Sequence, residues 1–129
     1  MTTTILIVED EAAIADLARS LLEEEGYRVV LAPNGREGLR RLAEERFDLV
    51  ISDVMMPLMD GREFARTMRG DPTNREIPLV LMSAAGRGTV DGVPHTAFLF
   101  KPFDLGIFIA LIARLLPSFP LGESGSSAV

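Results

Sequence analysis

Residues 49–61, LVISDVMMPLMDG, decide the fold and place its most informative side chain. The run 49–52 is apolar up to a final serine, Asp53 closes it, and residues 56–61 contain the chain-breaking residues Pro57 and Gly61. This pattern is typical of a buried strand that delivers a carboxylate to the loop at its carboxyl end. Because ligands bind at that edge in open α/β sheets, the stretch predicts a functional role for Asp53.

A second acidic cluster, Glu9-Asp10-Glu11, ends another apolar run, Thr4–Val8. If the two strands are parallel neighbours, three or four carboxylates converge at one end of the sheet. Like charges held that close raise one another's pKa, or they need a cation between them. The two clusters together therefore predict a metal-dependent site.

The composition is that of one globular domain: 129 residues, of which 47% are hydrophobic and 25% are charged. The formal net charge of −6 disfavours a nucleic-acid surface. The chain has no cysteine, which excludes thiolate chemistry and fits a reducing cytoplasm. Apolar periodicity begins at Ile5 without a basic leader, and the longest apolar stretch, 105–116, is too short for a bilayer. We therefore expect a cytoplasmic domain with no signal peptide, no membrane contact and no direct nucleic-acid partner.

Strand and helix patterns alternate along the chain. The strand-like runs are Thr4–Val8, 27–32, 49–52, 77–82 and Ala97–Phe100. Four helices are predicted, three of them from apolar side chains at helical spacing. These side chains are Ile14, Leu17, Ala18 and Leu21 in the first, Leu39, Leu42 and Ala43 in the second, and Phe64 and Met68 in the third. The last helix is expected over residues 103–116. Gly26 is expected to end the first helix and Asn34 to cap the second. The glycine-rich segment 84–96 is poor helix material, so a helix there is expected to be short or irregular.

Continuous apolar strands separated by amphipathic helices predict a parallel sheet with helices on both faces. Five such units fit a flavodoxin-like, doubly wound α/β fold with strand order 2-1-3-4-5 better than a Rossmann fold. In that order the first and third strands adjoin, so Glu9, Asp10 and Asp53 are expected to meet. We expect one domain over residues 1–117 and a flexible tail over residues 118–129, which are rich in Ser and Gly.

Two more polar side chains follow strands at the same edge. Ser83 follows the fourth strand and Lys101 follows the fifth. A hydroxyl and an ammonium beside three carboxylates suit phosphoryl chemistry, with a carboxylate as the nucleophile and Mg²⁺ to neutralise the clustered charge. The lysine and the hydroxyl can then hold the phosphoryl oxygens.

These motifs resemble the receiver, or phosphoacceptor, domain of bacterial two-component response regulators. The matching stretches are residues 7–11 (IVEDE), 52–61 (SDVMMPLMDG), 82–84 (MSA) and 100–103 (FKPF). They occur in order, each at a strand end, and the resemblance covers residues 3–116. It implies that Asp53 is the phosphate acceptor and that Glu9, Asp10, Asp53 and the backbone carbonyl of Met55 bind Mg²⁺, with Mn²⁺ as an alternative ion.

The resemblance also implies roles for residues of the last two strands. Ser83 and Lys101 would bind the phosphoryl group, and the Lys101–Pro102 peptide would be cis. Ser83 and Phe98 would form a switch in which the Phe98 rotamer follows the Ser83 hydroxyl. The chain would accept a phosphoryl group from a histidine kinase or a phosphotransfer protein and signal to an unknown downstream protein. No enzymatic activity is expected beyond its own Mg²⁺-dependent phosphorylation and dephosphorylation.

The chain departs from the family pattern in two places. Met55 and Ala85, at the two positions that tune dephosphorylation in receivers, are apolar, so neither orients an attacking water and slow dephosphorylation is expected. The short segment 84–96 puts the usual partner surface of receivers in doubt. The last helix is apolar all round, which indicates a partner or a homodimer through that helix. Its residues expected inside are Ile107, Phe108, Leu111 and Leu115, and its further apolar residues are Ile109, Ile112 and Leu116.

Other functions fit the sequence less well. A haloacid-dehalogenase-type phosphohydrolase needs a second aspartate where Met55 stands. A flavodoxin needs a phosphate-binding loop where the chain has Glu9-Asp10-Glu11, which would repel an anionic cofactor. Glu11 itself is expected to be a helix-start carboxylate rather than a ligand. A pseudo-receiver, acting as a phosphorylation-independent interaction module, stays open as the alternative.

Overall fold

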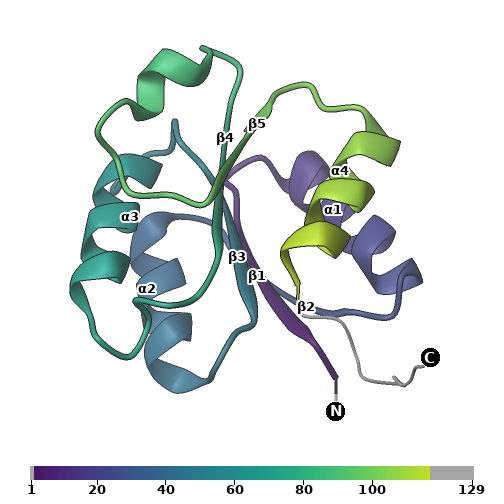
Figure 1. Ribbon diagram of the computed structural model, residues 1–129, viewed down its shortest axis with the longest axis horizontal. Coiled ribbons are helices and arrows are strands. Elements are labelled where there is room, and N and C mark those ends of the chain that lie inside the picture. The colour runs from purple at the N-terminus through teal and green to yellow at the C-terminus, as the bar shows by residue number, and fades with distance from the viewer. Residues whose placement is uncertain (1, 117–129) are drawn as a thin grey trace.

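A five-stranded parallel sheet forms the middle layer of the computed structural model, which describes residues 2–116 (Figure 1). The strands are β1 (Thr4–Val8), β2 (Arg28–Ala32), β3 (Leu49–Asp53), β4 (Leu79–Ser83) and β5 (Ala97–Phe100). Their order is β2-β1-β3-β4-β5, which confirms the predicted flavodoxin-like fold. Val8 lies opposite Ser52, and Asp53 lies opposite Met82, so the carboxyl ends of the central strands meet at one edge.

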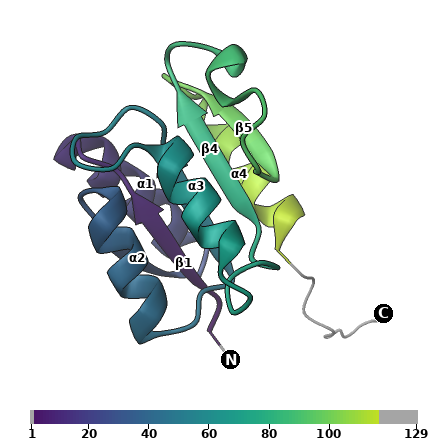
Figure 2. The same ribbon diagram turned by 90° about the vertical axis from the view of Figure 1, so that its left-hand side faces the viewer.

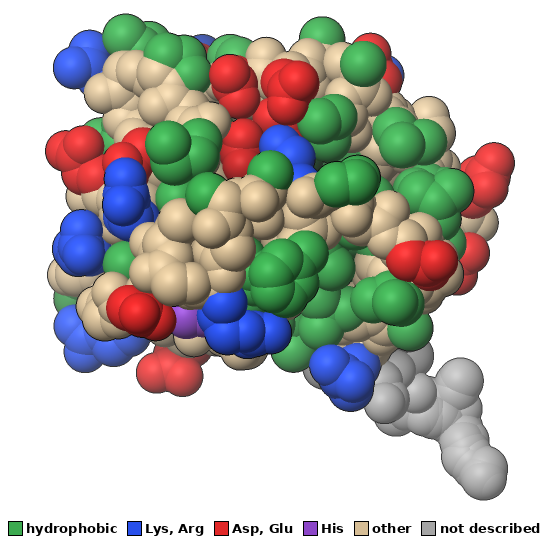
Figure 3. Space-filling view, turned by 90° about the horizontal axis from the view of Figure 1, so that it is seen from above, with side chains coloured by type: hydrophobic (Ala, Val, Ile, Leu, Met, Phe, Trp, Pro, Cys, Tyr) green, Lys and Arg blue, Asp and Glu red, His purple; other side chains and the backbone are tan. Residues whose placement is uncertain are grey.

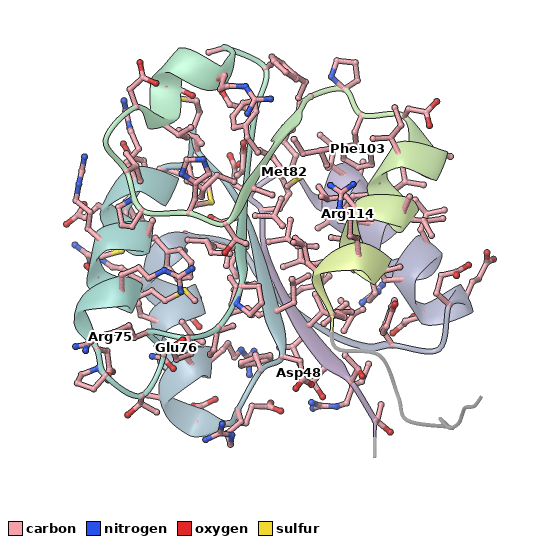
Figure 4. All side chains as sticks on the ribbon, viewed as in Figure 1. Asp48, Arg75, Glu76, Met82, Phe103 and Arg114 are labelled. Carbon is pink, nitrogen blue, oxygen red and sulfur yellow. The ribbon has the colours of Figure 1, made fainter. Side chains whose placement is uncertain are left out.

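Helices cover both faces of the sheet (Figures 1 and 2). The helices are α1 (Ala12–Glu24) and α4 (Leu105–Leu115) on one face, and α2 (Gly35–Glu44) and α3 (Gly61–Gly70) on the other. The core is thereby divided in two: Leu6 and Val8 pack in the layer of α2 and α3, whereas Ile5 and Ile7 pack in the layer of α1 and α4. Met82 of β4 also faces the second layer (Figure 4). Because both faces are buried, the strands must be apolar at successive positions, which explains their continuous runs.

Polar side chains fix where three of the helices begin. The Oδ1 of Asn34 accepts a hydrogen bond from the backbone N of Glu37 at 2.9 Å, which confirms the predicted cap of α2. The Oδ1 of Asp60 accepts from the backbone N of Arg62 at 2.9 Å at the start of α3. The Oδ1 of Asp104 accepts from the backbone N of Ile107 at 2.9 Å at the start of α4. Such caps are each worth about 1 kcal/mol, because they satisfy backbone donors that the helix leaves unpaired.

The segment between β4 and β5 contains a single 3₁₀ turn, η1 (Arg87–Val90), in place of a full helix. This confirms the expectation for residues 84–96. Gly86 and Gly92 adopt φ of 98° and 74°, a region that side chains disfavour. The segment is nevertheless packed, since Val90 and Val93 are buried in the core layer of α2 and α3.

The buried stripe of two helices differs from the predicted one. In α4, Ile107 and Leu115 were predicted to be inside, but Ile107 is 62% exposed and Leu115 is only partly buried. Phe108 and Leu111 are buried as predicted. Ile112 and Leu116, the residue that follows the helix, are also buried, although they were not among the residues expected inside. Ile107 precedes the stripe by one residue, which rotates it by about 100° out of the core. In α1, Leu17 is exposed in the same way beside the buried Ala18.

Smaller differences concern the ends of elements. β4 begins at Leu79, two residues after the predicted start, because Pro78 has no N–H to donate to a neighbouring strand. α4 begins at Leu105 rather than at residue 103, since Asp104 is its cap. The predicted domain end at 117 and the tail 118–129 lie outside the described residues. Within residues 2–116, no helix has both the length and the apolar character needed to cross a membrane.

Candidate functional site

The polar residues predicted from the sequence gather at the carboxyl edge of the sheet. Glu9 follows β1, Asp53 ends β3 and Lys101 follows β5, so three separate strands deliver them. The strand order brings β1 beside β3, which places Glu9 next to Asp53. Figure 3 looks down on this edge and shows acidic side chains around a single basic one, with hydrophobic side chains on either side. Glu9 is 3% exposed and Asp53 is 4% exposed, so both carboxylates are nearly removed from water.

The Lys101 ammonium lies between three carboxylates. Its Nζ donates a hydrogen bond to Glu9 Oε1 at 3.0 Å and lies 3.2 Å from Asp53 Oδ2. The third partner is Glu11, whose Oε1 is 3.5 Å from the same nitrogen. An ammonium with three freely rotating donors suits this arrangement, because it can pair with several oxygens at once.

Three acidic side chains at this edge can share one cation. Glu9, Asp10 and Asp53 each offer a carboxylate oxygen, and these oxygens all lie within 4.8 Å of one another. Oxygen ligands of this kind are what Mg²⁺ takes in proteins, usually with several waters. Asp10 is exposed, which leaves room for those waters, while Glu9 and Asp53 are buried. The residues present therefore fit a divalent metal ion.

The electrostatic environment strains the two buried carboxylates. Burial raises the pKa of Asp53, and the nearby charge of Asp10 raises it further, against the opposing effect of Lys101. Burial likewise raises the pKa of Glu9, with an added contribution from Asp53, although the Glu11 backbone N–H and Lys101 oppose it. The protein thus holds negative charge where it is costly, which is the condition that a bound cation relieves.

The pKa of Lys101 is also raised, which for an ammonium favours the charged form. Burial alone would lower the pKa of its ammonium, but the hydrogen bond to Glu9 and the charges of Asp53 and Glu9 outweigh it and raise the pKa. The lysine is therefore charged at neutral pH. A fixed cation 3.2 Å from Asp53 is well placed to stabilise negative charge that develops there.

A close backbone approach holds the loop after Asp53 in place. The backbone N of Gly61 donates to the Val54 carbonyl at 2.8 Å, so the start of α3 is tied to the end of β3. A Cβ at Gly61 would stand 2.9 Å from Val54 Cα and closer still to the Asp53 carbonyl oxygen. Only glycine fits here without moving the strand that carries Asp53.

A cleft of about 280 Å³ opens beside Asp53. It is lined by Asp10, Glu11, Asp53, Met55, Ala84, Ala85 and Lys101. Met55 thus lines the cleft, and metal binding by its backbone carbonyl stays a prediction. Ser83 is fully buried, and its Oγ accepts a hydrogen bond from the Ala85 backbone N at 3.0 Å. Among the predicted residues, Ser83 therefore lies behind the cleft wall.

Phe98 lies away from the cleft, on the face of β5 that meets η1. It is 9% exposed and packs edge-to-face on Phe100, with ring centroids 5.0 Å apart. The Arg87 guanidinium lies 5.3 Å from the centroid of the Phe98 ring and 5.7 Å from that of Phe100. The Lys101–Pro102 bond is cis, as the resemblance implied.

Two residues at or near the site were not assigned these positions from the sequence. Glu11 precedes α1 but caps no backbone N–H with its side chain, and it reaches Lys101 instead. The acidic triplet 9–11 was the sequence signal for Glu11, since its three carboxylates all follow the end of the same strand. Arg87 had no signal, because its contact with β5 depends on how the irregular segment folds back.

Comparison with known proteins agrees with this geometry. The family model described as the response regulator receiver domain matches residues 5–113. The chain therefore belongs to the response regulator receiver domain family.

The relatives of this chain include response regulators and the receiver domain of a histidine kinase. The response regulator MprA of Mycolicibacterium vanbaalenii is 37% identical over 98% of this chain and 57% of its own length. The receiver domain of a signal transduction histidine kinase from Syntrophus aciditrophicus is 36% identical, with a TM-score of 0.85 over 89% of this chain and 90% of its own. The response regulator TrrA of Thermotoga maritima, solved in complex with Mg²⁺ and BeF, is 30% identical, with a TM-score of 0.81 over 89% of this chain and 100% of its own. The chain spans about half the length of the curated relatives it matches, or less.

Proposed function

We propose that this chain takes a phosphoryl group from a histidine kinase or a phosphotransfer protein onto Asp53 and signals through a changed protein-binding surface. The observation that carries the proposal is the Asp53 carboxylate held 3.2 Å from the Lys101 ammonium, beside Glu9 and Asp10 at the mouth of a cleft. The downstream partner and a cytoplasmic location stay predictions.

The proposed chemistry starts with an Asp53 carboxylate oxygen as the nucleophile toward phosphorus. Burial raises the pKa of Asp53 and thereby makes its oxygen a stronger base than an ordinary aspartate. Lys101 stands ready to pair with a phosphoryl oxygen, and the Ser83 hydroxyl supplies a second partner if the Ala84–Ala85 wall shifts. Glu9, Asp10, Asp53 and the Met55 carbonyl would hold Mg²⁺, which when bound neutralises the clustered negative charge.

The neighbouring structures support the metal requirement. TrrA was solved in complex with Mg²⁺ and BeF. That complex is a property of TrrA. It supports the same chemistry here because the acidic cluster and the lysine occupy one cleft in this chain.

A direct test uses Mg²⁺ with acetyl phosphate and follows the intact mass. We expect a gain of one phosphoryl group that depends on Mg²⁺ and is abolished by Asp53→Asn. Asp16→Asn is the matched control, because Asp16 is an exposed aspartate of α1 paired with Arg19 outside the cleft. Absence of the adduct, or an adduct that survives Asp53→Asn, would overturn the proposal and leave the phosphorylation-independent interaction module.

A further inference from the structure

Glu11 occupies a different position from the other carboxylates of the site. Its side chain is 62% exposed, whereas that of Glu9 is fully buried and that of Asp53 is 6% exposed. The Glu11 backbone N donates to Glu9 Oε2 at 3.0 Å, which anchors the backbone of Glu11 at the rim. Its carboxylate therefore stands at the entrance to the cleft, 3.5 Å from the Lys101 ammonium.

The charge of Glu11 exceeds what the proposed function needs. The carboxylates that can share a cation are Glu9, Asp10 and Asp53, without Glu11. The cleft is otherwise lined by Asp10, Asp53 and Lys101, which the proposed function uses, and by the uncharged Met55, Ala84 and Ala85. Glu11 thus adds a negative charge where a phosphodonor must enter, and it pairs with Lys101, the one cationic side chain among the residues that line the cleft.

We propose that Glu11 is a specificity-determining residue that selects against small dianionic phosphodonors. This inference rests on the proposed phosphoacceptor function of Asp53. A free dianion meets the Glu11 carboxylate at the entrance and finds Lys101 already paired with it. A protein donor offsets that repulsion with contacts elsewhere on its surface, which a donor of a few atoms cannot make. The cleft therefore favours donors that carry less negative charge or a docking surface.

The transfer step is the same for every donor. An oxygen of the Asp53 carboxylate forms the new bond to phosphorus while the bond from phosphorus to the leaving group breaks. With acetyl phosphate the leaving group is acetate, which departs with the electron pair of the P–O bond. With phosphoramidate it is ammonia, which departs with the electron pair of the P–N bond. Near neutral pH acetyl phosphate is a dianion and phosphoramidate carries a single net negative charge, so the two differ in the property that Glu11 senses.

The test compares rates of phosphorylation by these two donors at saturating Mg²⁺ in the unsubstituted protein and in Glu11→Gln. A unit charge about 7 Å from a dianion changes its free energy by about 1 kcal/mol in water, before screening. We therefore expect Glu11→Gln to raise the rate with acetyl phosphate about fivefold and the rate with phosphoramidate about twofold.

Three controls separate the charge of Glu11 from other effects. Glu24→Gln makes the same change at the far end of α1, about 20 Å along the helix and beyond the screening length, and is expected to leave both rates unchanged. Glu11→Asp keeps the charge and is expected to retain the discrimination. Added KCl should speed acetyl phosphate labelling of the unsubstituted protein more than that of Glu11→Gln, because salt screens repulsion.

The outcomes are distinguishable. If Asp53 is labelled but Glu11→Gln gives no gain, or the same gain with both donors, the role of Glu11 is overturned and the phosphoacceptor function stands. If no variant is labelled by either donor, both proposals fail together.

Discussion

Asp53 combines two demands that conflict in the metal-free protein. It is 4% exposed at the end of β3, yet a nucleophilic carboxylate must carry charge. Lys101 compensates only in part, because the pKa of Asp53 is still raised by burial. The fold thus stores unfavourable free energy at the residue that the proposed chemistry uses.

Removing this charge should stabilise the fold. Because burial raises the pKa of Asp53, the folded state binds more protons than the unfolded state between the ordinary pKa of about 4 and the raised one. Stability therefore falls as pH rises through that window, and the full cost is present above the raised pKa. We expect Asp53→Asn to raise the free energy of unfolding by about 1 kcal/mol in urea denaturation with a chelator present. Asp16→Asn, which is exposed, should change it little, and equal stability of both variants would contradict the argument.

Met55 and Ala85 bear on the lifetime of the phosphorylated form. Both line the cleft, and neither can orient an attacking water firmly, because alanine has no polar atom and the methionine sulfur is only a weak acceptor. We expect a half-life well above seconds, and Met55→Asn should shorten it by about threefold or more by orienting that water. The half-life is measured as the loss of the phosphoryl mass from the intact protein with time. Met55→Leu is the control, because it keeps an apolar side chain at the same position. A half-life of seconds in the unsubstituted protein would sink the idea.

Among the elements, the loop from β3 to α3 shapes the site most directly. The motif 52–61 was recognised in the sequence, but the reason for its glycine became visible only in the fold. Gly61 is needed because its Cα approaches the backbone of β3, a contact between residues eight apart that no local pattern encodes. Strand identity was predictable, since burial on both faces forces an apolar run. The exposed position of Ile107 was not, because α4 is apolar nearly all round and its sequence does not say which stripe faces inward.

Alanine substitution should separate two glycines of α3. Gly61→Ala would press its Cβ against the Asp53 carbonyl and should lower the free energy of unfolding by about 2–3 kcal/mol. At Gly70 a Cβ meets nothing within 4 Å, so Gly70→Ala should raise it by about 0.5–1 kcal/mol. Thermal or urea unfolding of the pair tests this. Equal effects at the two positions would show that the close approach is not limiting.

The same loop carries a strained leucine. Leu58 has φ of 69° and is 68% exposed, and the Met59 backbone N donates to the Pro57 carbonyl at 2.8 Å around it. We expect Leu58→Gly to be more stable than Leu58→Ala by about 1 kcal/mol, because only glycine lacks the Cβ that this conformation crowds. Both variants remove the exposed leucine side chain and differ from each other only by one methyl group, so the comparison isolates the effect of the Cβ. An alanine variant as stable as the glycine variant would refute the strain.

On the scale of the whole molecule, the sheet order determines the site more than any single element does. Five strands and their order followed from alternation, and the meeting of Glu9 with Asp53 followed from that order. The contact of Arg87 with Phe98 and Phe100 could not be predicted in this way, since it depends on how the irregular segment between β4 and β5 folds back onto β5. The predicted homodimer through α4 stays a prediction, although Leu105 and Ile107 are exposed on that helix.

Binding of Mg²⁺ should stabilise the molecule as a whole. An ion that binds only the folded state adds about 2.7 kcal/mol at a concentration one hundred times its dissociation constant. We therefore expect MgCl₂ to raise the melting temperature by several degrees and EDTA to reverse the shift. Asp10→Asn should weaken the response, because it replaces one of the three clustered carboxylates with a neutral amide without disturbing the core. NaCl at equal ionic strength is the control, and an equal shift with NaCl would argue against a specific site.

Lys101 has a practical consequence that follows from the amino-acid usage of the chain. Twelve of its thirteen basic residues are arginines, so Lys101 carries the only side-chain primary amine. Reductive methylation with ¹³C-formaldehyde would therefore place a single side-chain NMR label, inside the cleft, alongside that of the chain's own amino terminus. Its chemical shift would follow metal and phosphoryl occupancy without any engineered tag. The protein thus carries its own spectroscopic reporter at the cleft where we propose that phosphorylation occurs.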